Sequence, residues 1–331
     1  MIAAHVTAAA AFTVTRLVSD RARGARTRDA ALVNAWGLAA TPTGPWWVAN
    51  EARNTSTLYA GDGHKQALTV QVPCGPTGVA AYTGDGFVVR ARRASGPARF
   101  VYACEDGTIR AWSPTVPRGW SKEAVVAYDG GATGAVFRGV AIGGDRLYAT
   151  DFHNDRIVVL DRRWRRVPAR FRDPSIPAWY SPFGVRVLGG RLFVTYASPA
   201  PVNGNDAPKG GYVDEFTLDG RLLGRVRGDL AEPWGIALAP RDSEGGFGPF
   251  GGDLVVASFG TGRIDAYRRT AAGWRFDGRV ATVPGVWGIG FGNGHMAGPR
   301  TTLFFAAGPH RWRGASELDV HGLLGAISPR G

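Results

Sequence analysis

Cysteine and lysine are both scarce in this chain of 331 residues. Cysteine occurs only as Cys74 and Cys104, and lysine only as Lys65, Lys122 and Lys209. Two cysteines in so long a chain do not make the disulfide framework of a small secreted domain, so we expect two reduced thiols. Whether the two residues pair stays open at this point.

Long apolar runs and the common nucleotide-binding motifs are also missing. No stretch approaches the ~20 apolar residues of a membrane-spanning helix. Residues 1–8 carry neither the positive charge nor the apolar core of a secretory signal. We therefore expect a cytoplasmic protein with no membrane partner. The lack of a Walker loop, a dinucleotide fingerprint and a G-x-S-x-G elbow disfavours ATP, NAD and serine-hydrolase chemistry.

The basic residues are almost all arginine. The net charge is +12, and the densest basic run lies at residues 161–166. We expect this run at the outer edge of a sheet, where charge discourages edge-to-edge aggregation, so a solvated edge is the favoured interpretation. A nucleic-acid partner is therefore not expected, and a patch for an anionic partner is the alternative.

Glycine, in contrast, is abundant, and six glycines mark a repeat. In each copy a bulky or polar residue precedes the glycine, a branched apolar residue follows it, and a strongly apolar strand comes after a short turn. The copies lie at residues 36–38, 77–79, 138–140, 183–185, 234–236 and 287–289. Short strands and glycine turns at a period of roughly 40 to 60 residues are typical of a β-propeller.

The repeat predicts an all-β, six-bladed β-propeller in a single domain that covers residues 1–331. The last blade has no C-terminal segment left for its outermost strand, whereas residues 12–18 have strand composition and no partner. We expect this N-terminal strand to join the last blade and close the ring, which removes two open sheet edges. Seven blades are the alternative, because the gaps from Gly78 to Gly139 and from Gly184 to Gly235 are long.

Several segments resemble a known family. They are residues 17–20, 32–38, 56–63, 232–240, 291–294 and 322–327. These motifs, spread over nearly the whole chain, are similar to those of a family of uncharacterised bacterial six-bladed β-propeller proteins that is distantly NHL-repeat-like. The resemblance implies the fold and implies almost nothing about chemistry.

One face of the predicted propeller collects the candidate binding residues. The loops that enter the inner strands and those that leave the second strands lie on this face, around the mouth of the central channel. Four of the six residues that precede a repeat glycine are aromatic, and these rings either pack between blades or stack a planar or cationic ligand. The predicted substrate-binding residues are Trp36, Arg138, Phe183, Tyr196, Trp234, Trp287 and His310.

Ionisable side chains are predicted on the same face. The candidates for acid–base catalysis are Glu105, Asp151, His153 and Glu232. A carboxylate that is partly desolvated beside aromatic walls has a raised pKa, and a neighbouring carboxylate can orient a histidine. Residues 151–155 are the best single candidate, and the alternative is a turn in which Asn and Asp bond their own backbone.

No cofactor is expected, with calcium as the alternative. If a cation is bound, its oxygen ligands would be Asn50, Glu51, Asp151 and Glu232. Six-bladed lactonases of the gluconolactonase type hold calcium with similar side chains at the channel mouth. The spacing in this chain is not diagnostic of such a site.

Aromatic rings, one arginine, carboxylates and a histidine on a rigid scaffold can orient a substrate and move a proton. The sequence therefore favours a cofactor-independent enzyme that acts on a small, aromatic or planar organic molecule in a biosynthetic pathway. The reaction would be a cyclisation, elimination, isomerisation or hydrolysis. One alternative is a non-catalytic scaffold that binds a protein or peptide partner, and another is a calcium-dependent, lactonase-like hydrolase.

Overall fold

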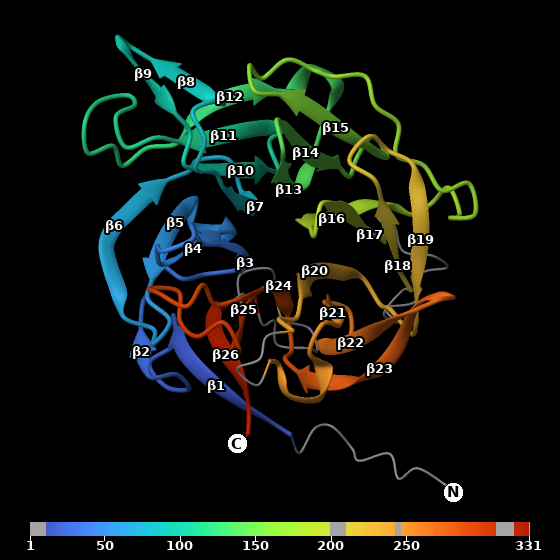
Figure 1. The fold of residues 1–331 in the computed structure, drawn as a ribbon. Helices are drawn as coiled ribbons and strands as arrows, with labels where there is room; N and C mark the ends of the chain where they lie inside the picture. The colour runs from blue at the N-terminus through green and yellow to red at the C-terminus, as the bar shows by residue number, and fades with distance from the viewer. Residues whose placement is uncertain (1–10, 199–209, 242–245, 309–320, 331) are drawn as a thin grey trace, which may run out of the picture.

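The computed structural model describes residues 11–198, 210–241, 246–308 and 321–330. Within these ranges the fold is all-β, and the helical segments are the short 3-10 turns η2 (Glu51–Arg53), η3 (Gly131–Thr133) and η4 (Gly248–Phe250). None of the described helical turns has the length or the apolar character that crossing a bilayer requires. The sheets stand around a common axis, as Figure 1 shows.

The first three sheets each follow the chain from the axis outward. One contains β3 (Ala35–Ala39), β4 (Trp46–Asn50), β5 (Thr55–Tyr59) and β6 (Lys65–Gln71). The next contains β7 (Pro76–Ala81), β10 (Phe100–Cys104), β11 (Thr108–Trp112) and β12 (Val125–Asp129). A small separate hairpin of β8 (Val88–Ala91) and β9 (Ala94–Pro97) is inserted within it. The third contains β13 (Phe137–Gly143), β14 (Arg146–Asp151) and β15 (Arg156–Asp161).

Two further meanders are joined at their outer strands into one continuous sheet. The first contains β16 (Ser181–Leu188), β17 (Arg191–Ala197), β18 (Tyr212–Phe216) and β19 (Leu222–Arg227). The second contains β20 (Pro233–Leu238), β21 (Leu254–Ser258), β22 (Arg263–Thr270) and β23 (Gly273–Thr282). The join is a short parallel pairing of β19 with β23.

The last sheet combines the two ends of the chain. It contains β24 (Val286–Phe291), β25 (Leu303–Ala307), β26 (Leu323–Pro329), β1 (Phe12–Ser19) and β2 (Thr27–Arg28). β1 pairs antiparallel with β26, from Phe12 opposite Pro329 to Ser19 opposite Leu323. The Phe12 ring also packs 4.7 Å from the ring of Phe247, so this N-terminal strand is anchored by both hydrogen bonds and apolar contacts.

The strands nearest the axis form a closed cycle. β3 contacts β7, β7 contacts β13, β13 contacts β16, β16 contacts β20, β20 contacts β24, and β24 contacts β3. Each of these inner strands carries one repeat glycine. Figure 1 shows them grouped around the centre of the ring.

The repeat glycines are needed because neighbouring inner strands approach too closely for a side chain. A Cβ added at Gly37 would lie 2.7 Å from the carbonyl oxygen of Thr77, and one added at Gly288 would lie 2.6 Å from that of Trp36. Both distances are shorter than a Cβ tolerates against backbone, which cannot move aside. The same close approach to the next inner strand occurs at Gly78, Gly184 and Gly235, and at Gly139 the nearest backbone atom of the next strand lies slightly farther away, at 3.0 Å.

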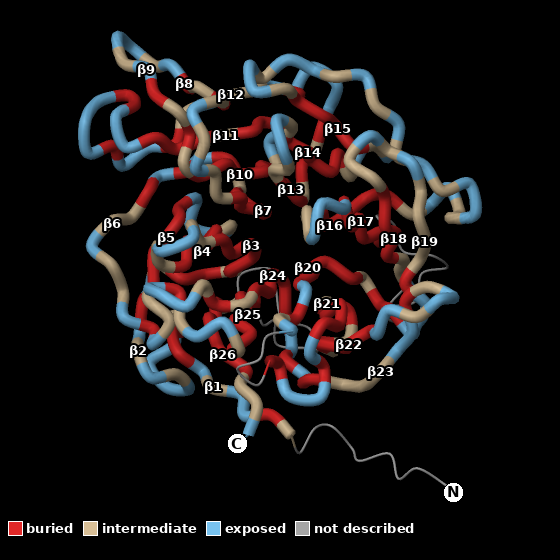
Figure 2. Tube along the Cα trace, in the orientation of Figure 1, coloured by how far each residue is buried: buried red, intermediate tan, exposed pale blue. Residues whose placement is uncertain are grey.

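The hydrophobic core lies between adjacent sheets. Figure 2 shows buried residues along the inner and middle strands and exposed residues along the outer strands and loops. Trp47 of β4, for example, stacks on Phe100 of β10 with ring centroids 3.8 Å apart. Alternating side chains of each strand therefore fill the space on either side of its sheet.

The expectation of two reduced thiols is wrong, because Cys74 and Cys104 form a disulfide. Cys74 precedes β7, Cys104 ends β10, and the antiparallel pairing of these strands places Pro76 opposite Cys104. The two Cα atoms lie 5.3 Å apart, within the range that a disulfide spans. Residues 30 apart in sequence thus become neighbours through strand pairing.

The basic run at residues 161–166 forms a turn at the end of β15. Arg165 pairs with Asp161 at 2.7 Å within this turn. The indole of Trp164 donates a hydrogen bond to the carbonyl of Val88 at 3.0 Å and packs against Phe87. The run therefore docks the inserted hairpin while several of its arginines remain exposed.

Candidate functional site

The aromatic residues that precede the repeat glycines meet at one end of the inner strands. We call Trp36, Phe183, Trp234 and Trp287, with Phe152 and Phe259 packed against them, the aromatic cluster. The ring of Trp287 stacks on Trp36 at 3.7 Å and on Phe259 at 3.8 Å, and the indole of Trp234 meets both tryptophans of this stack edge-on. The rings thus lie together as predicted, and they fill the end of the channel instead of lining an open pocket.

Three indole N–H groups of the aromatic cluster have no acceptor among the described residues. The Nε1 atoms of Trp36, Trp234 and Trp287 are buried and make no hydrogen bond to any described residue. Each unmade bond to a buried donor costs roughly 1–3 kcal/mol. The aromatic cluster therefore offers three indole N–H donors to a hydrogen-bond acceptor that reaches it.

Arg138 connects the aromatic cluster to two carboxylates. Its guanidinium carbon lies 5.4 Å from the ring centroid of Trp36 and 5.8 Å from that of Phe152. The same guanidinium forms an ion pair with Glu105. Burial lowers the pKa of Arg138, and the negative charge of Glu51 raises it in part. Glu51, Glu105 and Arg138 are the charge cluster, and the cation–π and ionic contacts fix the arginine from two sides.

Asn34, which sequence reasoning missed, positions one member of the charge cluster. Its side-chain amide donates to a Glu51 carboxylate oxygen at 2.6 Å. The backbone of Asn34 is left-handed, with φ of 47°, a conformation that Asn tolerates better than most residues. The sequence signal for this role was an asparagine two residues before the repeat tryptophan Trp36.

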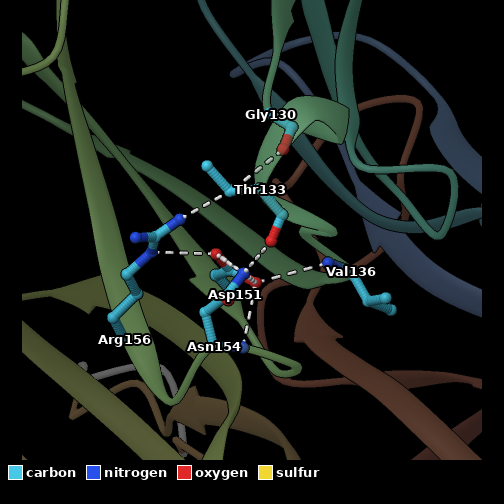
Figure 3. Close-up of polar contacts among 6 residues, drawn as sticks. All are labelled: Gly130, Thr133, Val136, Asp151, Asn154 and Arg156. Atoms are coloured by element: carbon cyan, nitrogen blue, oxygen red, sulfur yellow. Dashed lines mark hydrogen bonds and ion pairs between the residues drawn. The ribbon is translucent and has the colours of Figure 1, made fainter.

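Asp151 has a different role from the one expected for a free catalytic acid. It is fully buried, and it accepts hydrogen bonds from the Val136 N–H at 3.3 Å, the Asn154 side chain at 2.9 Å and Arg156 Nε at 2.9 Å. Arg156 also donates to Thr133 at 3.0 Å, as Figure 3 shows. This network matches the interpretation of residues 151–155 as a locally bonded turn.

His153 lies in the same turn as Asp151, and Glu232 lies in another loop. His153 is exposed and makes no hydrogen bond to a described residue, so no carboxylate orients its ring in this part of the chain. Glu232 is half-buried with φ of 50°, and its carbonyl accepts the N–H of Phe259 at 3.0 Å. The backbone of Glu232 thus helps to hold Phe259 against Trp287.

Two of the four residues expected to hold calcium make contacts with other side chains. Asn50 is buried and donates to Thr55 and Thr57, and Asp151 pairs with Arg156. Among the described residues, the acidic, histidine and cysteine ligands that gather within 4.8 Å are Cys74, Cys104 and Asp106. Glu51, Asp151 and Glu232 form no such group, and the two cysteines of this one are disulfide-bonded.

Tyr196, another predicted binding residue, does not belong to the aromatic cluster. Tyr196, at the end of β17, lines a separate cavity of about 350 Å³. His310 lies outside the described residues.

Arg186 is a charged residue in the central channel that sequence reasoning missed. It lines a channel cavity of about 20 Å³, enough for about one water molecule. It forms no ion pair with a described residue, and burial lowers the pKa of its guanidinium. The other five inner strands have a small residue two positions after the repeat glycine, namely Ala39, Ala80, Ala141, Ala237 and Gly290. The sequence signal for Arg186 was therefore a long charged residue at a repeat position where the other five copies have alanine or glycine.

Solved structures share the fold. Virginiamycin B lyase from Staphylococcus aureus matches with a TM-score of 0.53 and 13% identity, over 96% of this chain and 99% of the lyase. The RRP9 WD40 repeats match with a TM-score of 0.55 and 13% identity, over 98% and 99%. A gluconolactonase from Xanthomonas campestris matches with a TM-score of 0.51 and 16% identity, over 90% and 98%. At these identities the likeness shows the fold alone, and the predicted all-β propeller is confirmed.

No family model matches the chain, but its sequence has relatives in a virus. Uncharacterized protein R648 of Acanthamoeba polyphaga mimivirus is 34% identical over 270 residues, which are 76% of this chain and 65% of that protein. Uncharacterized protein L690 of the same virus is 31% identical over 278 residues, which are 78% of this chain and 72% of that protein. The match thus leaves about a third of each relative uncovered, and a specifically bacterial family is not supported. The chain belongs to the family of these uncharacterized mimivirus proteins.

Proposed function

We propose that the chain is an enzyme that performs acid–base chemistry on a small, flat organic molecule at the mouth of the propeller, without a redox cofactor. We define the mouth as the end of the inner strands where the aromatic cluster and the charge cluster lie. The observation that carries the proposal is the position of Arg138, which pairs with Glu105 and lies over the rings of Trp36 and Phe152. A cation and a carboxylate are thereby held together against aromatic rings at the mouth.

Each group has a distinct role in the proposal. Arg138 stabilises negative charge that develops on a substrate oxygen, and Glu105 accepts or returns the proton. Phe152 and Phe259 are half-buried and present the outer surface of the aromatic cluster to a planar substrate. His153, exposed in the turn after Phe152, is a second candidate proton carrier. The unpaired indole donors favour a substrate that carries hydrogen-bond acceptors.

We further propose that the described sheets belong to one six-bladed domain. The closed cycle of β3, β7, β13, β16, β20 and β24 supports this count. The pairing of β1 with β26 supports closure of the ring by the N-terminal strand.

The rival functions have less support. Tryptophans that bind a protein partner lie exposed on a free surface, whereas Trp36, Trp234 and Trp287 are between 5% and 8% exposed. A calcium-dependent hydrolase is not proposed, because Asp151 pairs with Arg156 and the described acidic residues of the expected set do not gather within 4.8 Å of one another. The virginiamycin B lyase and the gluconolactonase that share this fold are enzymes, and the analogy with them is one of scaffold only.

Metabolite profiling tests the proposed function. Purified protein is incubated with a small-molecule extract, and consumed compounds are identified by mass spectrometry. We expect at least one ring-bearing compound to be converted, and conversion to fall by about 100-fold or more in Glu105→Gln and in Arg138→Met. Glu123→Gln, which changes an exposed carboxylate, is the matched control and should keep full activity. No conversion by the unmodified protein, or full activity in both variants, would contradict the proposal.

A further inference from the structure

A cavity of about 350 Å³ lies between the turn at residues 155–157, the segment 169–178 and the ends of β16 and β17. Its volume is in the range of pockets that hold small organic molecules. None of its lining residues belongs to the aromatic cluster or the charge cluster. The cavity is therefore a different site from the proposed catalytic mouth.

The walls of this cavity are mixed in character, and two rings in them are held in place by other rings. Phe171 lies 5.8 Å from Tyr148 and 5.6 Å from Phe216, edge-on in both cases. Tyr180 lies edge-on to Tyr212 at 4.8 Å. Because their neighbours fix both lining rings, the cavity offers a preformed surface to a flat apolar group.

The hydroxyl of Tyr196 is a buried polar group without a partner at this cavity. Tyr196 is 5% exposed, and its hydroxyl makes no hydrogen bond to any described residue. Burial raises the pKa of Tyr196 well above its ordinary value, and the charges of Asp214, Asp173 and Asp155 raise it further. The hydroxyl is therefore protonated, and three carboxylates and the guanidinium of Arg225 lie near it.

The three carboxylates near Tyr196 are not equally engaged. Asp173 and Asp214 both pair with Arg225. Asp155 lines the cavity, but it makes neither a hydrogen bond nor an ion pair with a described residue. Burial raises the pKa of Asp155, and Arg172 lowers it in part. Asp155 is thus the carboxylate of this cavity that is available to a ligand.

The arginines that line the cavity are not the groups that bind the ligand. Arg156 is turned toward Asp151 and Thr133, to which it donates hydrogen bonds (Figure 3). Arg170 and Arg172 are exposed, so water solvates their charges. The cavity therefore contains the buried hydroxyl of Tyr196, unpaired among the described residues, and, at its exposed side, the unengaged carboxylate of Asp155.

We propose that this cavity is a second ligand site that binds a small molecule with a protonated amine on a flat apolar body. The ammonium group donates hydrogen bonds to the Asp155 carboxylate and to the Tyr196 hydroxyl oxygen. The apolar body packs against Phe171 and Tyr180. This site goes beyond the function proposed for the mouth, and its occupation does not require that function to be correct.

Calorimetry with three probes of matched shape tests the inference. We expect benzylammonium to bind at least about 10-fold more tightly than benzyl alcohol, because a hydrogen bond to a charged group is the stronger kind. Benzoate should bind more weakly still. Asp155→Asn should lower the affinity for benzylammonium by about 10-fold, and Tyr196→Phe by roughly 3-fold to 10-fold.

Two controls separate a binding role from a structural one. Tyr196→Phe should melt at the same temperature as the unmodified protein or above it, because it removes a buried hydroxyl that has no partner. Asp145→Asn, at the opposite end of β14, should leave the affinity for benzylammonium unchanged, as should Arg138→Met at the mouth. Equal binding of all three probes, no saturable binding at millimolar concentration, or an unchanged affinity in Asp155→Asn would overturn the inference.

Discussion

The guanidinium carbon of Arg138 lies 5.4 Å from the centre of the Trp36 ring, in the same structure in which Arg138 pairs with Glu105. This relationship ties the charge of the mouth to its aromatic packing. A double-mutant cycle with Arg138→Met and Glu105→Gln measures the coupling energy between the arginine and the glutamate. We expect a coupling of roughly 1–3 kcal/mol in the free energy of unfolding by urea, because both side chains are at most one third exposed.

The control for this cycle is the ion pair of Arg263 with Asp229, in which the aspartate is 88% exposed. Arg263→Met and Asp229→Asn should couple by only about 0.2–1 kcal/mol, the usual range for a solvated pair. A coupling between Arg138 and Glu105 that does not exceed the control would show that the charge cluster is solvated and not held in place.

Gly37→Ala should strongly destabilise the fold. The new methyl group would lie 2.7 Å from both the Thr77 carbonyl oxygen and the Val79 amide nitrogen, so two inner strands must separate. We expect a loss of about 3 kcal/mol or more in the free energy of unfolding. Gly224→Ala, where no atom lies within 4 Å, should change it by at most about 0.5 kcal/mol. Similar melting curves for the two variants would contradict the explanation given for the repeat.

Removal of the disulfide should also lower stability. Replacing Cys74 and Cys104 by Ala releases two points that are 30 residues apart. Because the bond restricts the unfolded chain, we expect a loss of roughly 3–4 kcal/mol, measured by urea denaturation without reductant. Mass determination of the oxidised and reduced protein checks the bond directly. Two alkylatable thiols in the folded, unreduced protein would be the contrary result.

Asp214 gives a prediction for pH dependence. Burial raises its pKa from an ordinary value of 3.8 to about 6, although Arg225 opposes the shift. The folded state therefore binds a proton that the unfolded state releases, so this group stabilises the fold at low pH and its contribution is lost as the pH rises from about 4 to about 6.

The measurement compares Asp214→Asn with the unmodified protein over this pH range. Asparagine cannot ionise, so the variant lacks the part of the decline due to Asp214, and the difference between the two unfolding free energies should change by roughly 3 kcal/mol at most over this pH range. Groups that titrate in both proteins cancel in that difference. A difference that stays flat with pH would mean that the carboxyl is not desolvated as described.

The sequence predicts the inner strands. It also predicts that the aromatic residues before the repeat glycines lie at the same end of those strands. A glycine that must touch the next strand recurs at each inner strand, and this requirement places Trp36, Arg138 and Trp234 at equivalent positions. Whether the rings would pack on one another could not be predicted, because side-chain directions depend on all the neighbours at once. The repeat locates a backbone position, and packing then decides what the side chain contacts.

The disulfide and the role of Asp151 illustrate two other limits. The inserted β8–β9 hairpin separates Cys74 from Cys104 in the sequence, so their proximity depends on the pairing of β7 with β10. The sequence suggests that Asp151 accepts a hydrogen bond from His153, two residues away. In the structure, Arg156 and Asn154 donate to the Asp151 carboxylate instead. Competition among several local donors is decided by turn geometry, which short sequence patterns do not reveal.

The closed cycle of inner strands has a consequence for how the molecule comes apart. Each sheet touches two neighbours through backbone that has no room to adjust, so no sheet can leave while the remaining ones keep their places. We expect heat or denaturant to melt the described sheets in one cooperative step, in contrast to open solenoids, whose ends fray first.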